Sequence, residues 1–117
     1  MIHTVLLVED EAELRESMQE ALELNGYTVI AARDGQEALD ELEHIDHLCL
    51  VLLELVMPRM NGWDFFARFR ERSELDDVPV IVHSSVPKQA PEGVTRVLAK
   101  PLEFNQLLST VEEFCGK

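Results

Sequence analysis

Short apolar runs alternate along the chain with segments whose apolar residues recur every three or four positions. The apolar runs predict five strands, at 3–8, 27–32, 48–54, 78–85 and 95–100. The segments with helical periodicity predict four helices, at 11–24, 35–43, 63–72 and 103–115. Strands that alternate with helices in this way are typical of a parallel sheet covered by helices on both faces.

The third predicted strand, 48–54, is apolar on both of its faces. Such a strand is expected at the centre of a parallel sheet. The alternation breaks after the fourth predicted strand, where residues 86–94 read VPKQAPEGV and contain two prolines and a glycine. These residues disfavour a helix, so we predict a loop with at most one helical turn between the fourth and fifth strands.

The composition fits one acidic domain. The 117 residues carry 23 acidic and 10 basic side chains, which gives a net charge of −13, and 46% of the residues are apolar. This charge repels nucleic acid and anionic membranes and favours a basic partner surface or a metal cation, although it can also serve solubility alone. The N-terminus does not resemble a signal peptide, and no segment is long and apolar enough to span a membrane, so we expect a cytoplasmic protein.

The chain has two cysteines, Cys49 and Cys115, which belong to no CxxC pair and no Cys/His cluster. Their spacing therefore gives no indication of a zinc site. We expect both to be free thiols in a reducing compartment.

Polar residues gather where the predicted strands end. Ligands of doubly wound sheets bind beyond the carboxyl ends of the strands, so these residues are expected to meet. They are Glu9 and Asp10 after the first strand, Glu54 after the third, Ser84 and Ser85 after the fourth, and Lys100 after the fifth. Carboxylates are ligands for Mg²⁺, and a lysine with a hydroxyl suits phosphate oxygens. The set therefore predicts a site for a divalent cation and a phosphoryl group.

Several of these residues also have a purely structural interpretation. Asp10 followed by Glu13 resembles a capping box that opens the next helix. The hydroxyl of Ser84 can bond its own backbone. Lys100 can be a surface lysine at the end of a strand. It is the order of all these residues at successive strand ends that favours a common site.

Two polar residues stand out within the apolar runs. Glu54 interrupts the apolar run LCLVLLELVM, where an ionised carboxylate is costly unless a charge balances it. Lys100 or a cation can supply that charge. His83 lies inside a predicted strand, and we expect a core or edge histidine there rather than a metal ligand.

Four motifs together resemble the receiver domain of bacterial two-component response regulators over essentially the whole chain. They are VLLVEDE, LLELVMPRMNG, VIVHSS and LAKP. The resemblance implies a single receiver domain, 1–117, with a flavodoxin-like, doubly wound sheet of five parallel strands in the order 2-1-3-4-5. It also implies a signalling module rather than an enzyme, whose partner is a histidine kinase or a downstream signalling protein.

The resemblance further assigns roles to single residues. Four groups would hold Mg²⁺: the carboxylates of Glu9, Asp10 and Glu54 and the backbone carbonyl of Val56. Two side chains would contact the phosphoryl oxygens: those of Ser84 and Lys100. The peptide bond between Lys100 and Pro101 would be cis.

The sequence departs from the family pattern at four places. The phosphoacceptor of the family is an aspartate, and Glu54 stands at that position. Val97 replaces the aromatic switch residue, Ser85 replaces what is usually an alanine, and 86–94 replaces most or all of a helix. The extra methylene of Glu54 moves the carboxylate by roughly 1 Å, and a misplacement of that size can slow transfer about 100-fold.

The altered acceptor leaves three functions open. In the first, the receiver recognises a protein partner without normal phosphorylation, and Glu54 imitates or prevents the phosphorylated state. In the second, it is an ordinary phosphorylatable receiver whose acceptor has been mutated. The third is a Mg²⁺-dependent phosphohydrolase, although the chain has no DxDxT-like nucleophile motif. We favour the first, because Val97 and the 86–94 segment have diverged together with Glu54.

Overall fold

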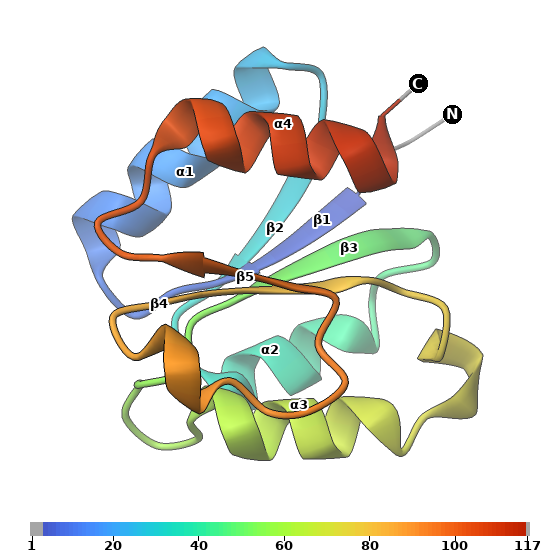
Figure 1. Ribbon diagram of the computed structural model, residues 1–117. Coiled ribbons are helices and arrows are strands. Elements are labelled where there is room, and N and C mark those ends of the chain that lie inside the picture. Colours follow the sequence, from blue (N-terminus) through green and yellow to red (C-terminus); the bar gives the residue numbers. More distant parts are fainter. Residues whose placement is uncertain (1–3, 117) are drawn as a thin grey trace.

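The computed structural model describes residues 4–116, and within them five strands alternate with helices (Figure 1). The strands are β1 (Thr4–Val8), β2 (Thr28–Ala32), β3 (Leu48–Leu53), β4 (Val80–Ser84) and β5 (Arg96–Ala99). The helices are α1 (Ala12–Leu24), α2 (Gly35–Leu42), α3 (Gly62–Arg70) and α4 (Phe104–Cys115), with 3-10 turns η1 (Ser73–Leu75) and η2 (Pro87–Gln89). Every predicted element is present, with ends within two residues of the predicted ones. The first predicted strand begins at His3, which lies outside the described residues.

The five strands form one parallel sheet in the order β2-β1-β3-β4-β5, which confirms the expected topology. β3 pairs with β1 and with β4, so it is central, as its two apolar faces predict. α1 and α4 cover one face of the sheet, and α2 and α3 cover the other (Figure 1). Because side chains alternate along a strand, Leu7 of β1 packs with α1 and α4, whereas Leu6 packs with α2 and α3.

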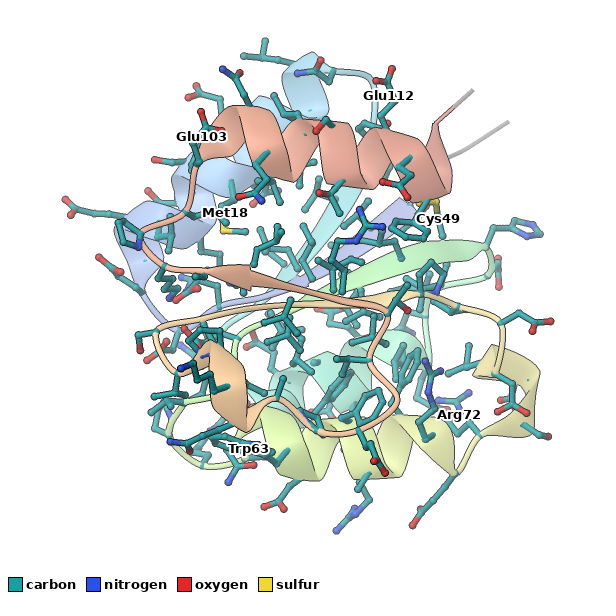
Figure 2. All side chains as sticks on the ribbon, in the orientation of Figure 1. Met18, Cys49, Trp63, Arg72, Glu103 and Glu112 are labelled. Carbon is teal, nitrogen blue, oxygen red and sulfur yellow. A yellow bond between two sulfur atoms is a disulfide. The ribbon has the colours of Figure 1, made fainter. Side chains whose placement is uncertain are left out.

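The segment 86–94 contains the short turn η2 and no α-helix, as its prolines predict. The indole Nε1 of Trp63 donates a hydrogen bond to the backbone carbonyl of Gln89, at 2.7 Å. This bond links η2 to Trp63, which lies near the start of α3 (Figure 2). A short turn therefore connects β4 to β5 in place of a crossover helix.

The start of α1 corrects one prediction. The helix begins at Ala12, so Glu11 rather than Asp10 precedes it, and the Glu11 side chain makes no capping hydrogen bond. The expected capping box of Asp10 and Glu13 is therefore wrong. Instead, Oε2 of Glu9 accepts a hydrogen bond from the backbone N–H of Glu11, at 3.1 Å, so a carboxylate from the end of β1 satisfies a donor ahead of the helix.

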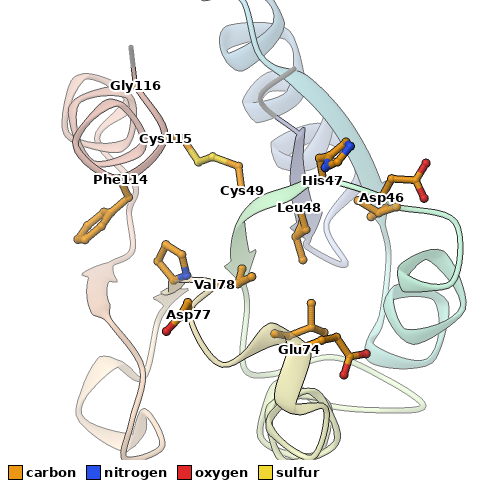
Figure 3. A pocket seen from close by; sticks show the side chains of 13 residues that line it. Asp46, His47, Leu48, Cys49, Glu74, Asp77, Val78, Phe114, Cys115 and Gly116 are labelled. Atoms are coloured by element: carbon orange, nitrogen blue, oxygen red, sulfur yellow. A yellow bond between two sulfur atoms is a disulfide. The ribbon is translucent and has the colours of Figure 1, made fainter. Parts of the chain in front are cut away.

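The two cysteines correct another expectation, because they are joined in a disulfide and are not free thiols (Figure 3). The Cα atoms of Cys49, near the start of β3, and Cys115, the last residue of α4, are 5.9 Å apart. α4 runs back along the sheet after β5, so its end returns to the edge where the strands begin. The spacing of 66 positions in the sequence does not reveal this geometry.

A hollow of about 900 Å³ lies beside the disulfide, at the edge where β3 and β4 begin (Figure 3). Its lining includes apolar side chains such as Leu48, Val78 and Phe114 and the acidic side chains of Glu74 and Asp77. It lies at the other end of the sheet from the polar cluster described below and shares no residue with that cluster.

Asp34 fastens the start of α2 to the turn after β3. Its Oδ1 accepts a hydrogen bond from the backbone N–H of Glu37 at 2.8 Å, and its Oδ2 lies 2.7 Å from both Nε and Nη2 of Arg59. Arg59 has a φ of 64°, a left-handed conformation that is uncommon for residues other than glycine. Burial alone would raise the pKa of Asp34, but the Glu37 N–H and Arg59 outweigh burial and lower that pKa below its usual value.

We expect Asp34→Ala to lower the free energy of unfolding by about 1–2 kcal/mol at neutral pH, because it removes a helix cap. Since the pKa of Asp34 is lowered in the folded state, its stabilisation is complete above the ordinary pKa of 3.8 and is lost as pH falls through the folded-state value. Urea unfolding at pH 7 and in increasingly acidic buffers should show that the difference in free energy of unfolding between Asp34→Ala and native protein becomes smaller as the pH falls. Asp34→Asn keeps a cap without the charge, so its free energy of unfolding should differ less from that of native protein. A difference for Asp34→Ala that does not change with pH would rule out a role for the carboxylate charge.

Candidate functional site

Three buried side chains form one row across the carboxyl ends of three adjacent strands. Glu9, Glu54 and His83 follow the alternation of β1, β3 and β4, so each continues the face of the sheet that α1 and α4 cover. All three residues are at most 3% exposed. One ligand-type atom of each lies within 4.8 Å of those of the other two. Strand order and alternation therefore bring together three titratable residues, which we call the buried trio.

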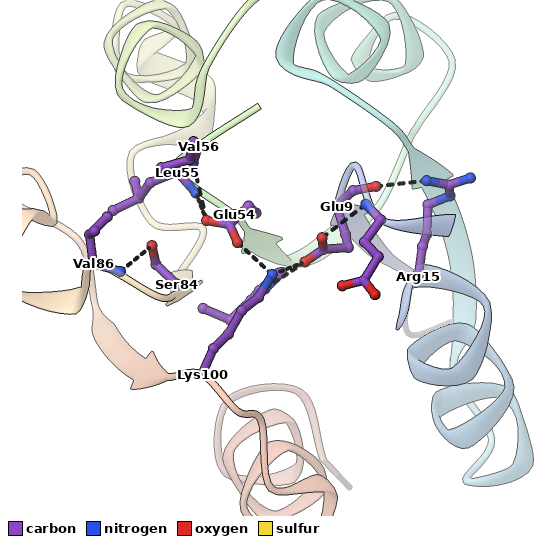
Figure 4. Close-up of polar contacts among 10 residues, drawn as sticks. Glu9, Arg15, Glu54, Leu55, Val56, Ser84, Val86 and Lys100 are labelled. Carbon is purple, nitrogen blue, oxygen red and sulfur yellow. Dashed lines mark hydrogen bonds and ion pairs between the residues drawn. The ribbon is translucent and has the colours of Figure 1, made fainter. Parts of the chain in front are cut away.

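Lys100, just after β5, supplies the charge that balances the two carboxylates. Its Nζ lies 2.9 Å from Oε1 of Glu9 and 2.5 Å from Oε1 of Glu54 (Figure 4). The lysine side chain is 18% exposed and the carboxylate side chains are 0% and 4% exposed, so the pairing takes place largely away from water. Glu54 is tolerated at the end of an apolar strand because this ammonium pairs with it.

The second oxygen of Glu54 is held by the backbone that follows β3. Its Oε2 accepts hydrogen bonds from the N–H groups of Leu55, at 2.5 Å, and Val56, at 3.1 Å. The N–H of Gly62 donates to the Leu55 carbonyl at 2.8 Å, and a Cβ at position 62 would collide with the backbone of residues 54 and 55. Gly62, the last residue of the LLELVMPRMNG motif, therefore permits the close approach of its own backbone to that of residues 54 and 55, which shapes the site around Glu54.

Electrostatic coupling shifts three pKa values in the site. Burial alone would raise the pKa of Glu9, but interactions with His83 and Lys100 outweigh burial and lower this pKa to about 2. Burial alone would lower the pKa of Lys100, but Glu54 and Glu9 outweigh burial and raise it above its usual value. Partial burial and the charge of Glu9 raise the pKa of Asp10. Glu9 and Lys100 are therefore a stable ion pair at neutral pH.

The other predicted site residues differ in their exposure and in their contacts. Ser84 is fully buried, and its Oγ accepts a hydrogen bond from the backbone N–H of Val86 at 3.1 Å, as its structural interpretation suggests. Asp10 lies in the bend after β1 and is exposed, but its carboxyl stays next to that of Glu9, so that its pKa is raised by partial burial and by the charge of Glu9. Val97 is half-buried on β5.

Two further groups flank the site. The peptide bond between Lys100 and Pro101 is cis, as the resemblance implies. Val56 is 54% exposed, and its N–H faces Glu54. The metal-binding role of the Val56 carbonyl stays a prediction.

Two contributors to the site were missed in the sequence. His83 is buried as expected, but its Nδ1 also lies 3.3 Å from Oε1 of Glu9. Alternation was the available signal, because residues 54 and 83 fall on the same face of paired strands. Nη1 of Arg15, in the first turn of α1, donates a hydrogen bond to the backbone carbonyl of Glu9 at 2.8 Å. No sequence motif predicts this contact.

A doubly wound sheet with buried carboxylates, a lysine and a serine at its carboxyl edge defines a receiver-type signalling domain. The sequence profile of the response regulator receiver domain matches residues 5–112, and the chain belongs to that family. Receiver domains are modules of two-component signalling that carry phosphotransfer chemistry, and they interact with histidine kinases and effectors.

Known relatives and solved structures agree with this assignment. The chain is 34% identical over 111 residues to the response regulator MprA of Mycolicibacterium vanbaalenii, covering 90% of this chain and 47% of that protein. It is 32% identical over 116 residues to the transcriptional regulatory protein CpxR of Escherichia coli K12, covering 94% and 48%. The chain thus spans about half the length of these curated relatives. The chemotaxis protein CheY4 of Vibrio cholerae superposes with a TM-score of 0.85 at 27% identity, covering 97% of this chain and 99% of that one.

Proposed function

We propose that this receiver domain acts through protein–protein interaction without phosphorylation at position 54. The observation that carries the proposal is that both oxygens of the Glu54 carboxylate are engaged, one by Lys100 and the other by two backbone N–H groups. An acceptor carboxylate has to present an oxygen in line with the incoming phosphorus. Glu54 is 3% exposed and is held away from such an approach by its own contacts.

The contacts of Glu54 are also those that an anion at the site would make. An ammonium and adjacent backbone N–H groups are donors that bind phosphate oxygens. Glu54 takes them with one charge and two oxygens, where a phosphoryl group offers about two charges and three oxygens. The Oγ of Ser84 accepts a hydrogen bond from the N–H of Val86, and no hydrogen bond joins Ser84 to Glu54 within the described residues, so the imitation is partial. We infer a domain held in one conformation rather than switched between two.

Mg²⁺ is the cation that receiver domains hold at their acidic residues. Glu9 and Glu54 offer hard oxygen ligands of the kind it prefers, and Asp10 is exposed nearby. The fit is incomplete, because Lys100 Nζ contacts both buried carboxylates. Mg²⁺ bound here would neutralise carboxylate charge. We propose that Glu9 and Glu54 bind it weakly, in competition with the lysine.

We propose that residues 1–117 act as one receiver domain in the cytoplasm, with a histidine kinase or a downstream signalling protein as partner. A net charge of −13 favours a basic partner surface and disfavours direct contact with nucleic acid. Among the described residues, no helix combines the length and apolarity needed to cross a bilayer.

Phosphotransfer to position 54 can be measured directly. Native protein and Glu54→Asp are incubated with Mg²⁺ and a small acyl phosphate donor, and adducts are followed by intact mass. We expect no stable stoichiometric adduct on native protein. Glu54→Asp should be labelled, because the shorter side chain frees the contacts of Lys100 for a phosphoryl group. Glu54→Gln, which keeps the length but loses the charge, is the matched control and should stay unlabelled.

Each outcome separates the open functions. A stoichiometric adduct on native Glu54 would overturn the proposal and favour the ordinary phosphorylatable receiver whose acceptor has been mutated. If Glu54→Asp is not labelled either, then residue 54 is not the only feature that prevents phosphorylation. Steady release of phosphate by native protein would instead favour the phosphohydrolase.

A further inference from the structure

His83 differs from Glu9 and Glu54, the other two residues of the buried trio, because its side chain makes no short polar contact. The residue is 0% exposed, and neither of its ring nitrogens has a well-formed hydrogen bond within residues 4–116. Nδ1 lies 3.3 Å from Oε1 of Glu9, and Nε2 has no polar partner among the described residues. Buried polar groups are nearly always hydrogen-bonded, so an imidazole held only by this long contact has room for a stronger ligand.

The position of His83 suggests what that partner is. Ligand atoms of Glu9, Glu54 and His83 lie within 4.8 Å of one another and come from three adjacent strands of a rigid sheet. A metal ion with ligand bonds of about 2.0–2.2 Å requires ligand atoms roughly 3–4 Å apart. Small side-chain movements would bring the three atoms to that spacing.

We propose that the buried trio binds a divalent transition metal ion, with Zn²⁺ as the ion to test, through one imidazole nitrogen and two carboxylates. Imidazole is a good ligand for zinc, copper, iron and nickel, whereas Mg²⁺ prefers oxygen ligands and keeps several waters. The nitrogen of His83 therefore makes the site selective against Mg²⁺. The inference rests on the proposed function in one respect, since it needs Glu54 as an unmodified carboxylate.

Charge balance makes Lys100 the competitor of the metal ion. With two carboxylates and one ammonium, the cluster carries an excess negative charge, and the ammonium contacts the Oε1 atoms that the metal ion would use. A divalent ion would neutralise both carboxylates. The lysine side chain is 18% exposed and can turn outward when the ion enters. Lys100 thus balances the carboxylate charge when no metal ion is bound, and it lowers the affinity for a metal ion because the ion has to displace it.

Titration calorimetry on metal-free, oxidised protein tests the proposal, with the cysteines held in their disulfide so that they offer no thiolate. We expect one Zn²⁺ per chain, bound at least tenfold more tightly than Mg²⁺. His83→Leu should weaken Zn²⁺ binding tenfold or more and leave Mg²⁺ binding unchanged. His47→Leu, which removes an exposed histidine, is the matched control and should bind Zn²⁺ as native protein does.

A variant can also lose metal binding because its folded state is destabilised, so a second, spectroscopic measurement is made on native protein. Co²⁺ added to native protein should give visible absorption bands of a site with mixed nitrogen and oxygen ligands, and Zn²⁺ should displace them. Equal affinities for Zn²⁺ and Mg²⁺, or unchanged Zn²⁺ binding by His83→Leu, would overturn the proposal. The proposal would also be overturned if His47→Leu weakened Zn²⁺ binding as much as His83→Leu does, because the ion would then be bound at the surface. None of these results depends on whether Glu54 can be phosphorylated.

Discussion

Replacing Lys100 with methionine is expected to lower the free energy of unfolding by about 3–5 kcal/mol, because it leaves two buried carboxylates without their cation. Methionine retains much of the apolar stem of lysine, so the loss reports mainly the missing charge. The cost is large because Glu9 and Glu54 are almost fully buried and cannot regain their hydration in the folded state. Urea unfolding of metal-free protein at neutral pH measures the loss.

Two companion variants make this result specific. Lys88→Met removes an exposed lysine of η2 and should change the free energy of unfolding by less than about 0.5 kcal/mol. The double variant Lys100→Met with Glu54→Gln should recover part of the loss, because it removes one of the two unpaired charges. A loss below about 1 kcal/mol in Lys100→Met would mean that the ion pairs contribute no more than exposed ones do.

Reduction of the disulfide is expected to lower the free energy of unfolding by about 4 kcal/mol. The bond joins residues 66 positions apart, and closing a loop of that length restricts the unfolded chain strongly in the chain-entropy account of disulfide stabilisation. Urea unfolding with and without a thiol reductant measures the effect. The double variant Cys49→Ser with Cys115→Ser should unfold like the reduced protein and should not respond to reductant.

The state of this cysteine pair also bears on where the protein works. A reducing compartment keeps most cysteine pairs open, so a disulfide is unusual for the cytoplasmic domain that we propose. Alkylation of free thiols immediately on cell lysis, followed by intact mass, gives the state in the cell. Two alkylated thiols would assign the disulfide to the oxidised protein only, and an unalkylated protein would contradict a reducing location.

The sequence was sufficient for the fold because local patterns and strand order agree. β3 is apolar on both faces and lies at the centre of the sheet, and residues 86–94 form a short turn, as their prolines predict. These features depend on residues close together in the chain. The receiver motifs then fixed the order of the strands, which periodicity alone leaves open.

The members of the site were predicted in part, and the omissions have physical causes. Glu9 and Asp10 both follow β1; Glu9 is buried and Asp10 is exposed beside it, and the metal-binding role of both stays a prediction. The pairing of Lys100 with both buried carboxylates was anticipated only as one way to balance Glu54. The contact between Asp34 and Arg59 and the disulfide join positions far apart in the chain, and composition and spacing carry no signal for either.

The hydrogen bond from Trp63 to Gln89 gives the protein an intrinsic fluorescent reporter. The chain has a single tryptophan, so its emission comes from one place, the contact between α3 and η2. If η2 moved away from α3, the indole would lose this partner and meet more water. Emission wavelength and quenching by a neutral solute would then follow that movement without any label. The same signal, recorded while a protein partner is added, would show whether η2 belongs to the surface that the partner binds.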